Sequence, residues 1–159
     1  MKYERFEHLP VWQASINLAA EIYVFTTKSA FRKHYSLRDQ LERATVSISN
    51  NIAEGFERGT NQELVAFLYI ARGSAGELRS MLYLLERFPT FRGIESEILN
   101  LKSKAEAISK QLGAWTRSVQ NSGMKGEKYV TDRSRKAAEA ARQRKAFLEE
   151  LERIRNKSS

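Results

Sequence analysis

Apolar residues recur at the 3.6-residue period of an α-helix through most of the first 120 residues of this chain. Only two prolines and eight glycines occur in the 159 residues, and no segment alternates apolar and polar residues as a half-buried strand would. Four amphipathic segments are joined by short connections, which is typical of an antiparallel bundle. The sequence therefore predicts an all-α, up-down-up-down four-helix bundle over residues 1–120.

The first predicted helix begins at Pro10, because proline suits the first helical position. Its expected buried stripe holds Val11, Trp12, Ser15, Ile16, Ala19, Ile22, Tyr23 and Thr26. Leu18 and Phe25 fall off this stripe. The second helix is expected to open at Ser36, with Asp39 completing an approximate capping box, and to end near Gly55 as a left-handed stop residue.

The third and fourth predicted helices carry the most regular stripes. Thr60-Asn-Gln-Glu63 is a capping box that opens a helix of about 28 residues before Pro89. Its stripe is Leu64, Phe67, Leu68, Ala71, Ala75, Leu78, Leu82 and Leu85. The fourth helix runs from about Ile94 to Val119, through Ile98, Leu101, Ala105, Ile108, Leu112 and Trp115.

Residues 121–131 are predicted to form a linker, and residues 132–159 a basic helical tail. Asp132 is placed to cap a fifth helix that reaches Arg155. The apolar side of this helix is limited to Phe147, Leu148, Leu151 and Ile154. We therefore expect the tail to be exposed to solvent and to become ordered when a partner binds it.

The formal net charge of +8 is unevenly distributed along the chain. Residues 121–159 hold eleven Lys and Arg against six acids, so most of the excess charge lies in the tail. A basic surface of this kind predicts a polyanionic partner, nucleic acid first and an anionic membrane second, while solubility alone is the simpler alternative. The candidate phosphate-binding residues are Arg32, Lys33, Arg38, Arg43, Arg72, Arg79, Lys125, Lys128, Arg133, Arg135, Lys136, Arg142, Arg144 and Lys145.

Several kinds of chemistry are absent from the sequence. The chain has no cysteine, neither His8 nor His34 belongs to a Glu-x-x-His pair, and no Gly-x-Ser-x-Gly elbow occurs. Arg72-Gly-Ser-Ala-Gly76 lacks the lysine of a phosphate-binding loop. We therefore expect a protein that is not an enzyme and that needs no cofactor or metal. The N-terminus has no apolar signal-peptide core and no apolar run approaches a membrane span, so a cytoplasmic location without membrane contact is expected.

Short polar groups lie beside the buried stripe of the second helix, and they need partners if they are buried. We expect Asn51, Glu54, Ser74 and Glu77 to form a structural network that pairs the second and third helices. Gly73-Ser-Ala-Gly76 predicts a close helix crossing or a subunit contact, because glycine in a helix interior needs compensation.

Self-association is suggested by a second apolar line on the third helix, formed by Val65, Ile70, Met81 and Leu84. The off-stripe Leu18 and Phe25 of the first helix widen the apolar surface in the same way. Apolar patches that a bundle does not bury usually mark interfaces, although a few ordinary exposed leucines are the alternative.

Four motifs extend the interpretation: Leu9-Pro-Val-Trp-Gln13, Leu37-Arg-Asp-Gln-Leu41, Ser47-Ile-Ser-Asn-Asn-Ile-Ala-Glu-Gly55 and Phe67-Leu-Tyr-Ile-Ala-Arg-Gly-Ser-Ala-Gly-Glu-Leu78. Together they resemble the bacterial four-helix-bundle proteins encoded in intervening sequences of 23S ribosomal RNA. That family is also similar to the accessory variability determinants of diversity-generating retroelements. Leu112-Gly-Ala-Trp115, followed by a basic tail, is closer to the retroelement branch.

The resemblance implies a homopentameric, funnel-shaped barrel with a basic surface. In the retroelement branch it implies binding to RNA or DNA and to a reverse transcriptase, in support of mutagenic copying of a template repeat. The alternative is an oligomeric protein–protein scaffold of the intervening-sequence type without a nucleic-acid function.

Overall fold

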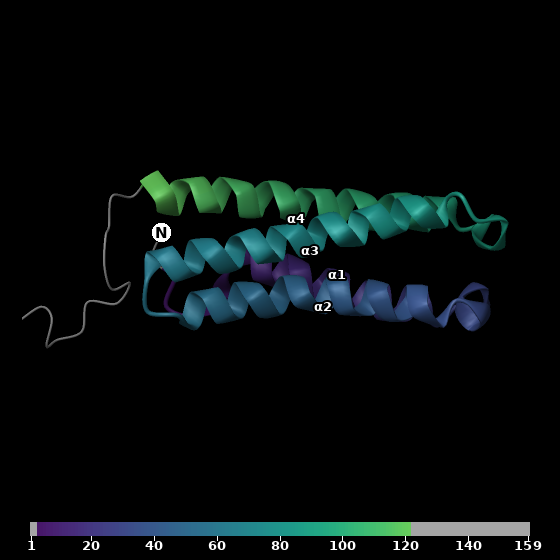
Figure 1. The fold of residues 1–159 in the computed structure, drawn as a ribbon, viewed down its shortest axis with the longest axis horizontal. Helices are drawn as coiled ribbons and strands as arrows, with labels where there is room; N and C mark the ends of the chain where they lie inside the picture. The colour runs from purple at the N-terminus through teal and green to yellow at the C-terminus, as the bar shows by residue number, and fades with distance from the viewer. Residues whose placement is uncertain (1–2, 122–159) are drawn as a thin grey trace, which may run out of the picture. The chain divides into compact units, whose positions relative to one another are not determined.

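The computed structural model of this chain describes residues 3–121, which form four long α-helices and three short 3-10 helices. The long helices are α1 (Pro10–Thr26), α2 (Tyr35–Glu57), α3 (Asn61–Leu85) and α4 (Glu95–Asn121), and the short ones are η1 (Phe6–His8), η2 (Ser29–Lys33) and η3 (Pro89–Phe91). Consecutive long helices run in opposite directions, and residues 3–121 contain no strand (Figure 1). The predicted all-α, up-down-up-down bundle is confirmed for this part of the chain.

The predicted linker and tail fall almost wholly outside this range. Asn121, the first residue of the predicted linker, is the last residue of α4, and residues 122–159 lie outside the described part of the chain. The predicted pentamer and the predicted tail helix both stay predictions.

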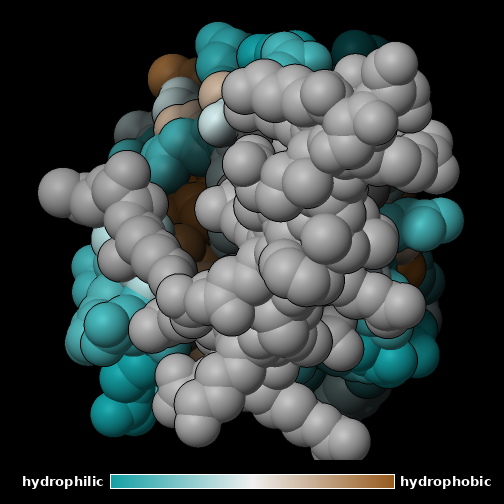
Figure 2. All heavy atoms as spheres, turned by 90° about the vertical axis from the view of Figure 1, so that its left-hand side faces the viewer, coloured by the Kyte–Doolittle hydropathy of each residue, from teal (hydrophilic) through white to brown (hydrophobic). Residues whose placement is uncertain are grey.

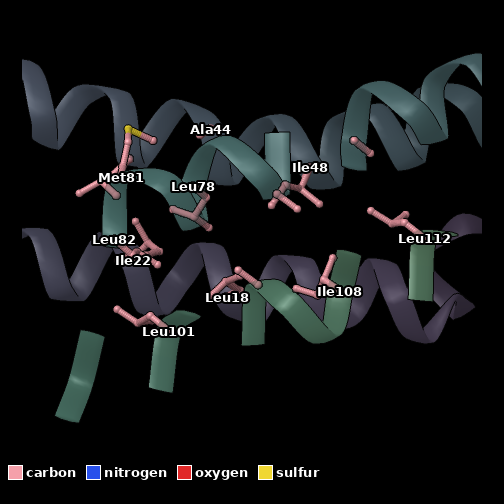
Figure 3. Packing of buried hydrophobic residues seen from close by; sticks show 14 of the residues in the cluster. Leu18, Ile22, Ala44, Ile48, Leu78, Met81, Leu82, Leu101, Ile108 and Leu112 are labelled. Carbon is pink, nitrogen blue, oxygen red and sulfur yellow. The ribbon is translucent and has the colours of Figure 1, made fainter. Parts of the chain in front are cut away.

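All four helices contribute side chains to one core along the bundle axis (Figure 3). The stripes predicted for the third and fourth helices are buried, apart from Phe67 and Trp115, which are half-buried. Burying a Leu or Ile side chain contributes about 1.5–3 kcal/mol, so this core is the main source of stability. Core residues that are at most 1 % exposed include Leu18, Ile22, Ile48, Leu78, Leu82, Ile108 and Leu112.

The expected rotation of α1 is partly wrong. Leu18 and Phe25 are only 1 % and 3 % exposed, whereas Ile16 and Tyr23 are 39 % and 46 % exposed. The physical reason is that α1 packs against two neighbours, α2 and α4, so its buried arc is wider than a single stripe. Leu18 faces the region of Ile108 on α4. Leu18 and Phe25 are therefore part of the core and do not form an exposed patch for self-association.

The beginning of α2 also differs from the prediction. The helix begins at Tyr35, so Ser36 lies inside its first turn, and the N-cap residue is His34, whose side chain makes no capping hydrogen bond. The His34 carbonyl instead accepts the first hydrogen bond of the helix from the Arg38 amide at 3.0 Å. The preceding η2 leads directly into α2 and leaves no extended residue at which Ser36 could act as a cap.

Gly55 does not end α2, which continues to Glu57. In the described residues the one glycine with a positive φ is Gly93, at +94°, so Gly55 is not a left-handed stop. A Cβ placed on Gly55 would lie only 2.6 Å from the Cβ of Phe67 on α3. Glycine is required here because α2 and α3 approach each other closely.

The capping box of α3 is confirmed at its N-terminus. The Thr60 hydroxyl oxygen accepts a hydrogen bond from the Glu63 amide at 3.2 Å, and the hydroxyl donates to Glu63 Oε2 at 2.9 Å. The helix is shorter than expected, with 25 residues, and ends at Leu85. Residues 86–94 then form a connection that contains η3 and Gly93.

Aromatic side chains hold together the two connections at one end of the bundle, where α1 joins α2 and α3 joins α4 (Figure 1). Phe31 packs on Phe91 with ring centroids 4.8 Å apart and on Phe25 at 5.3 Å. The His34 ring stacks on Phe88 at 5.7 Å and an interplanar angle of 16°. These contacts join α1–α2 to α3–α4 at this end.

The outer side of α3 remains largely uncovered within residues 3–121. Of the predicted second apolar line, Met81 is buried and Val65 half-buried, while Ile70 and Leu84 are 51 % and 45 % exposed. A Cβ on Gly73 or Gly76 would meet no atom within 4 Å. The predicted close crossing at these two glycines is therefore not formed by another helix of the described bundle.

Candidate nucleic-acid interface

One half of the α3–α4 seam contains no acidic residue. No Asp or Glu occurs in residues 64–76 of α3 or in residues 107–121 of α4, which together contain Arg72, Lys110 and Arg117. The two stretches lie side by side in the antiparallel pair, where Gln120 Nε2 on α4 donates to the Tyr69 hydroxyl on α3 at 3.2 Å. We call this part of the structure the basic seam.

Two arginines of the basic seam converge on one glycine. The Arg72 Cζ and Nη1 atoms and the Arg117 Nη1 atom each lie 3.5 Å from the point where a Cβ on Gly113 would stand. Both guanidinium groups therefore border the same small volume, and one comes from each helix. Gly113 is buried and presents no side chain that would hold the two groups apart.

Neither arginine has an ion-pair partner among the described residues, whereas Lys110 pairs with Glu106 at 2.8 Å on the same helix. Two neighbouring cations without a carboxylate repel each other, and an anion between them removes that repulsion. Guanidinium groups bind phosphate through two parallel hydrogen bonds, so the pair is suited to a phosphate of a nucleic acid.

Arg79 extends the seam by two turns of α3 and shares a face with Arg72, as predicted. It is half-buried and lies close to Glu106. The hydrogen bond and charge of Lys110 lower the pKa of Glu106, and the positive charge of Arg79 adds to this effect. The Arg79 charge is thus partly compensated, and Arg72 and Arg117 carry the uncompensated charge.

The predicted basic residues of α2 are engaged in ion pairs. Arg38 Nε lies 2.7 Å from Glu42 Oε1, and Arg43 Nε lies 3.2 Å from Asp39 Oδ2. Both arginines lie early in α2, at the opposite end of the bundle from the C-terminus of α4 (Figure 1). The atoms nearest to the Cβ position of Gly113 belong to Arg72 and Arg117 and not to these two arginines.

Arg32 and Lys33 are exposed on η2, at the same end of the bundle as the start of α2, and they form no ion pair in the described structure. The remaining predicted phosphate-binding residues lie outside the described residues: Lys125, Lys128, Arg133, Arg135, Lys136, Arg142, Arg144 and Lys145.

The polar network between α2 and α3 is centred on Ser47. Its hydroxyl lies 2.8 Å from the Ser74 hydroxyl, and Asn51 Nδ2 donates to Ser47 Oγ at 3.0 Å and to the Ser47 carbonyl at 2.7 Å. Glu54 instead pairs with Arg58 at 2.7 Å. Glu77 is exposed and makes no hydrogen bond or ion pair within residues 3–121. Two of the four predicted members are thus joined, through Ser47.

Sequence reasoning missed Arg117, Gly113 and Gln120. Each is unremarkable alone, because a single arginine or glycine on a helix is usually a solvated or packing residue. The signal that would have identified them is the absence of acids from both facing stretches of α3 and α4. The total charge of the chain hides that local pattern.

Metal-binding groups and membrane-spanning helices were sought in the described range. Residues 3–121 contain no group of three His, Cys, Asp or Glu side chains placed to hold a metal ion. None of the helices in this range is both long and apolar enough to cross a membrane. Figure 2 shows the end of the bundle where α2 joins α3. The described residues that can be seen there are mainly hydrophilic.

Fold and seam together define a small all-α bundle protein with a candidate anion-binding face. The sequence profile of the 23S rRNA-intervening sequence protein family matches residues 7–114, about two thirds of the chain, and the chain belongs to that family. A search of curated protein sequences found no match.

Proposed function

We propose that this protein is a non-enzymatic accessory protein that binds RNA or DNA through the basic seam and its basic tail. In this role it assembles as a homopentamer, binds a reverse transcriptase and supports template-primed, mutagenic cDNA synthesis in a diversity-generating retroelement. It acts in the cytoplasm and needs no cofactor.

The observation that carries the nucleic-acid part is the convergence of Arg72 and Arg117 over Gly113 without an acidic partner among the described residues. Keeping two guanidinium groups together is unfavourable for the isolated bundle, because like charges at short range repel. A bound phosphate turns this repulsion into charge-assisted hydrogen bonds. The retroelement role is supported by the sequence motifs that resemble the accessory variability determinants.

Gly113 allows the site to be tested with a single matched pair of variants. Gly113→Asp places a carboxylate between the two guanidinium groups. This negative charge should compensate their positive charge and occupy the place of a phosphate. Gly113→Ala fills the same space without charge, and its Cβ would make only ordinary contacts at 3.5 Å. We expect Gly113→Asp to lose most nucleic-acid binding and Gly113→Ala to keep it.

The measurement is a fluorescence-anisotropy titration of labelled RNA at several salt concentrations. Removal of one arginine–phosphate interaction should reduce the slope of log K against log salt by about 0.7 for a single strand or 0.9 for a duplex. Arg72→Ala and Arg117→Ala should each flatten the slope, while Arg43→Ala, which removes a paired charge, should not. Equal affinity and slope for the parent and Gly113→Asp would refute the site.

The reverse transcriptase part is tested separately. The tagged full-length protein should co-purify with a reverse transcriptase after nuclease treatment, because a bridge made only of RNA would be removed by that step. If the enzyme is recovered neither with nor without nuclease treatment, this partner is excluded, and the nucleic-acid proposal is unaffected.

A second candidate function is an oligomeric protein–protein scaffold, favoured by the half-exposed Ile70 and Leu84 beside the open Gly73 and Gly76 on α3. An apolar strip of this kind suits a helix of a second copy. If the scaffold is the whole function, Ile70→Glu should abolish oligomers in light scattering, and the parent should bind RNA no better than Gly113→Asp does.

A further inference from the structure

An aromatic ring lies one helical turn from the arginine pair. Tyr69 precedes Arg72 by three residues on α3, and Gln120 follows Arg117 by three residues on α4, so each pair shares a helix face. The Tyr69 side chain is 50 % exposed, and its hydroxyl accepts a hydrogen bond from Gln120 Nε2 at 3.2 Å. The four side chains form one surface across the two helices.

The hydrogen bond from Gln120 matters because it restricts the motion of the Tyr69 side chain before anything binds. An exposed tyrosine normally loses side-chain freedom when a ligand stacks on it, and a ring already held loses less. Tyr83, which lies farther along α3, is a useful contrast. Its ring is about equally exposed, but Lys102 Nζ lies 3.9 Å from the ring centroid and occupies one face.

The spacing of Tyr69 and Arg72 along α3 also fits one nucleotide. Three residues correspond to a rise of about 4.5 Å along the helix axis, which is of the same order as the separation of a base from its own phosphate. A nucleotide can therefore place a phosphate on the arginine pair and a base on the ring. In a duplex the bases are stacked on each other, so a duplex can offer only its phosphates.

We infer that the basic seam prefers single-stranded nucleic acid, and that Tyr69 is the platform on which one unpaired base stacks while Arg72 and Arg117 hold a phosphate. This inference rests on the proposed nucleic-acid function and specifies its substrate class. The recognition is tolerant of sequence, because every base has a face that can stack and no base edge is read here.

The test compares three labelled probes with the full-length protein: a 12-nucleotide oligo-U, the same oligonucleotide with abasic positions in its centre, and a 12-base-pair RNA duplex. The parent should bind oligo-U more tightly than the abasic probe. Tyr69→Leu removes the ring and should weaken oligo-U binding about tenfold, as stacking on an aromatic side chain typically contributes. The same variant should bind the abasic probe and the duplex as the parent does.

Tyr69→Phe is the matched control, since it keeps the ring and loses only the hydroxyl. It should bind oligo-U within about threefold of the parent. If Tyr69→Leu weakens all three probes equally, or none of them, the single-strand inference is overturned. In either case the RNA titration of Arg72→Ala still tests the proposed nucleic-acid function, because phosphate binding by the arginine pair does not need the ring.

Discussion

Replacing Gly55 by alanine should destabilise the bundle, although alanine is the better helix former. The added Cβ would lie 2.6 Å from Phe67 Cβ and 3.4 Å from the Leu64 carbonyl oxygen. Phe67 Cβ is attached to the backbone of α3, so no change of rotamer relieves the clash and α2 must move away from α3. Overpacking costs about 1–3 kcal/mol. Alanine recovers roughly 1 kcal/mol through its helix propensity, so a net loss of up to about 2 kcal/mol is expected.

Urea and thermal denaturation followed by circular dichroism would measure this loss. Gly73→Ala is the matched control, because no atom lies within 4 Å of its added Cβ. It should gain about 1 kcal/mol, which for a domain of this size raises the melting temperature by about 3–5 °C. If Gly55→Ala unfolds at the same urea concentration as Gly73→Ala, the close approach of α2 and α3 is not what requires glycine at this position.

Three further predictions concern buried or half-buried polar groups. Burial raises the pKa of Glu42, but hydrogen bonds from Thr26 and Arg38 outweigh it and the net pKa is lowered. The stability that results is present above the ordinary glutamate pKa of 4.5 and is lost as the pH falls through the lowered value. Urea unfolding should therefore separate Glu42→Gln from the parent at pH 7 and much less at pH 2.5. Thr45→Val should stabilise the bundle by about 1 kcal/mol in the same assay, because the buried hydroxyl has no hydrogen-bond partner in the described residues. Asn51→Ala removes both side-chain hydrogen bonds of that amide and should cost about 1–2 kcal/mol, while RNA affinity of the folded protein stays unchanged.

The helix count and most of the core could be predicted from periodicity because α3 and α4 each bury one dominant stripe. Prediction was weaker for α1, where apolar residues surround most of the helix. The sequence does not say which of two neighbours such a helix faces, and the choice between Leu18 and Ile16 depends on the position of α4. A similar limit applies to Gly55. Glycine is typical both of the end of a helix and of a close approach between two helices, so the residue type alone does not distinguish the two roles.

The candidate site could be predicted only in part. Arg72 and Arg79 share a face of α3, and their spacing of seven residues indicates this directly. Arg117 and Gly113 belong to another helix, and their relation to Arg72 depends on the antiparallel register of α3 and α4. Ion pairs are a further feature that the basic pattern leaves open, since Arg38 pairs with Glu42 on the same helix.

The polar network and the basic seam are connected by the rotation of α3. Ser74 follows Arg72 by two residues, which places the two side chains about 200° apart around the helix axis. Ser74 faces α2, where it makes a hydrogen bond with Ser47. The opposite side of α3, which carries Arg72, therefore faces α4 and Gly113. If α3 were free to rotate, the two guanidinium groups would move apart, because their mutual repulsion favours separation. The hydrogen bond between Ser47 and Ser74 thus adds to the buried stripe of α3 in fixing the rotation that brings Arg72 to Gly113.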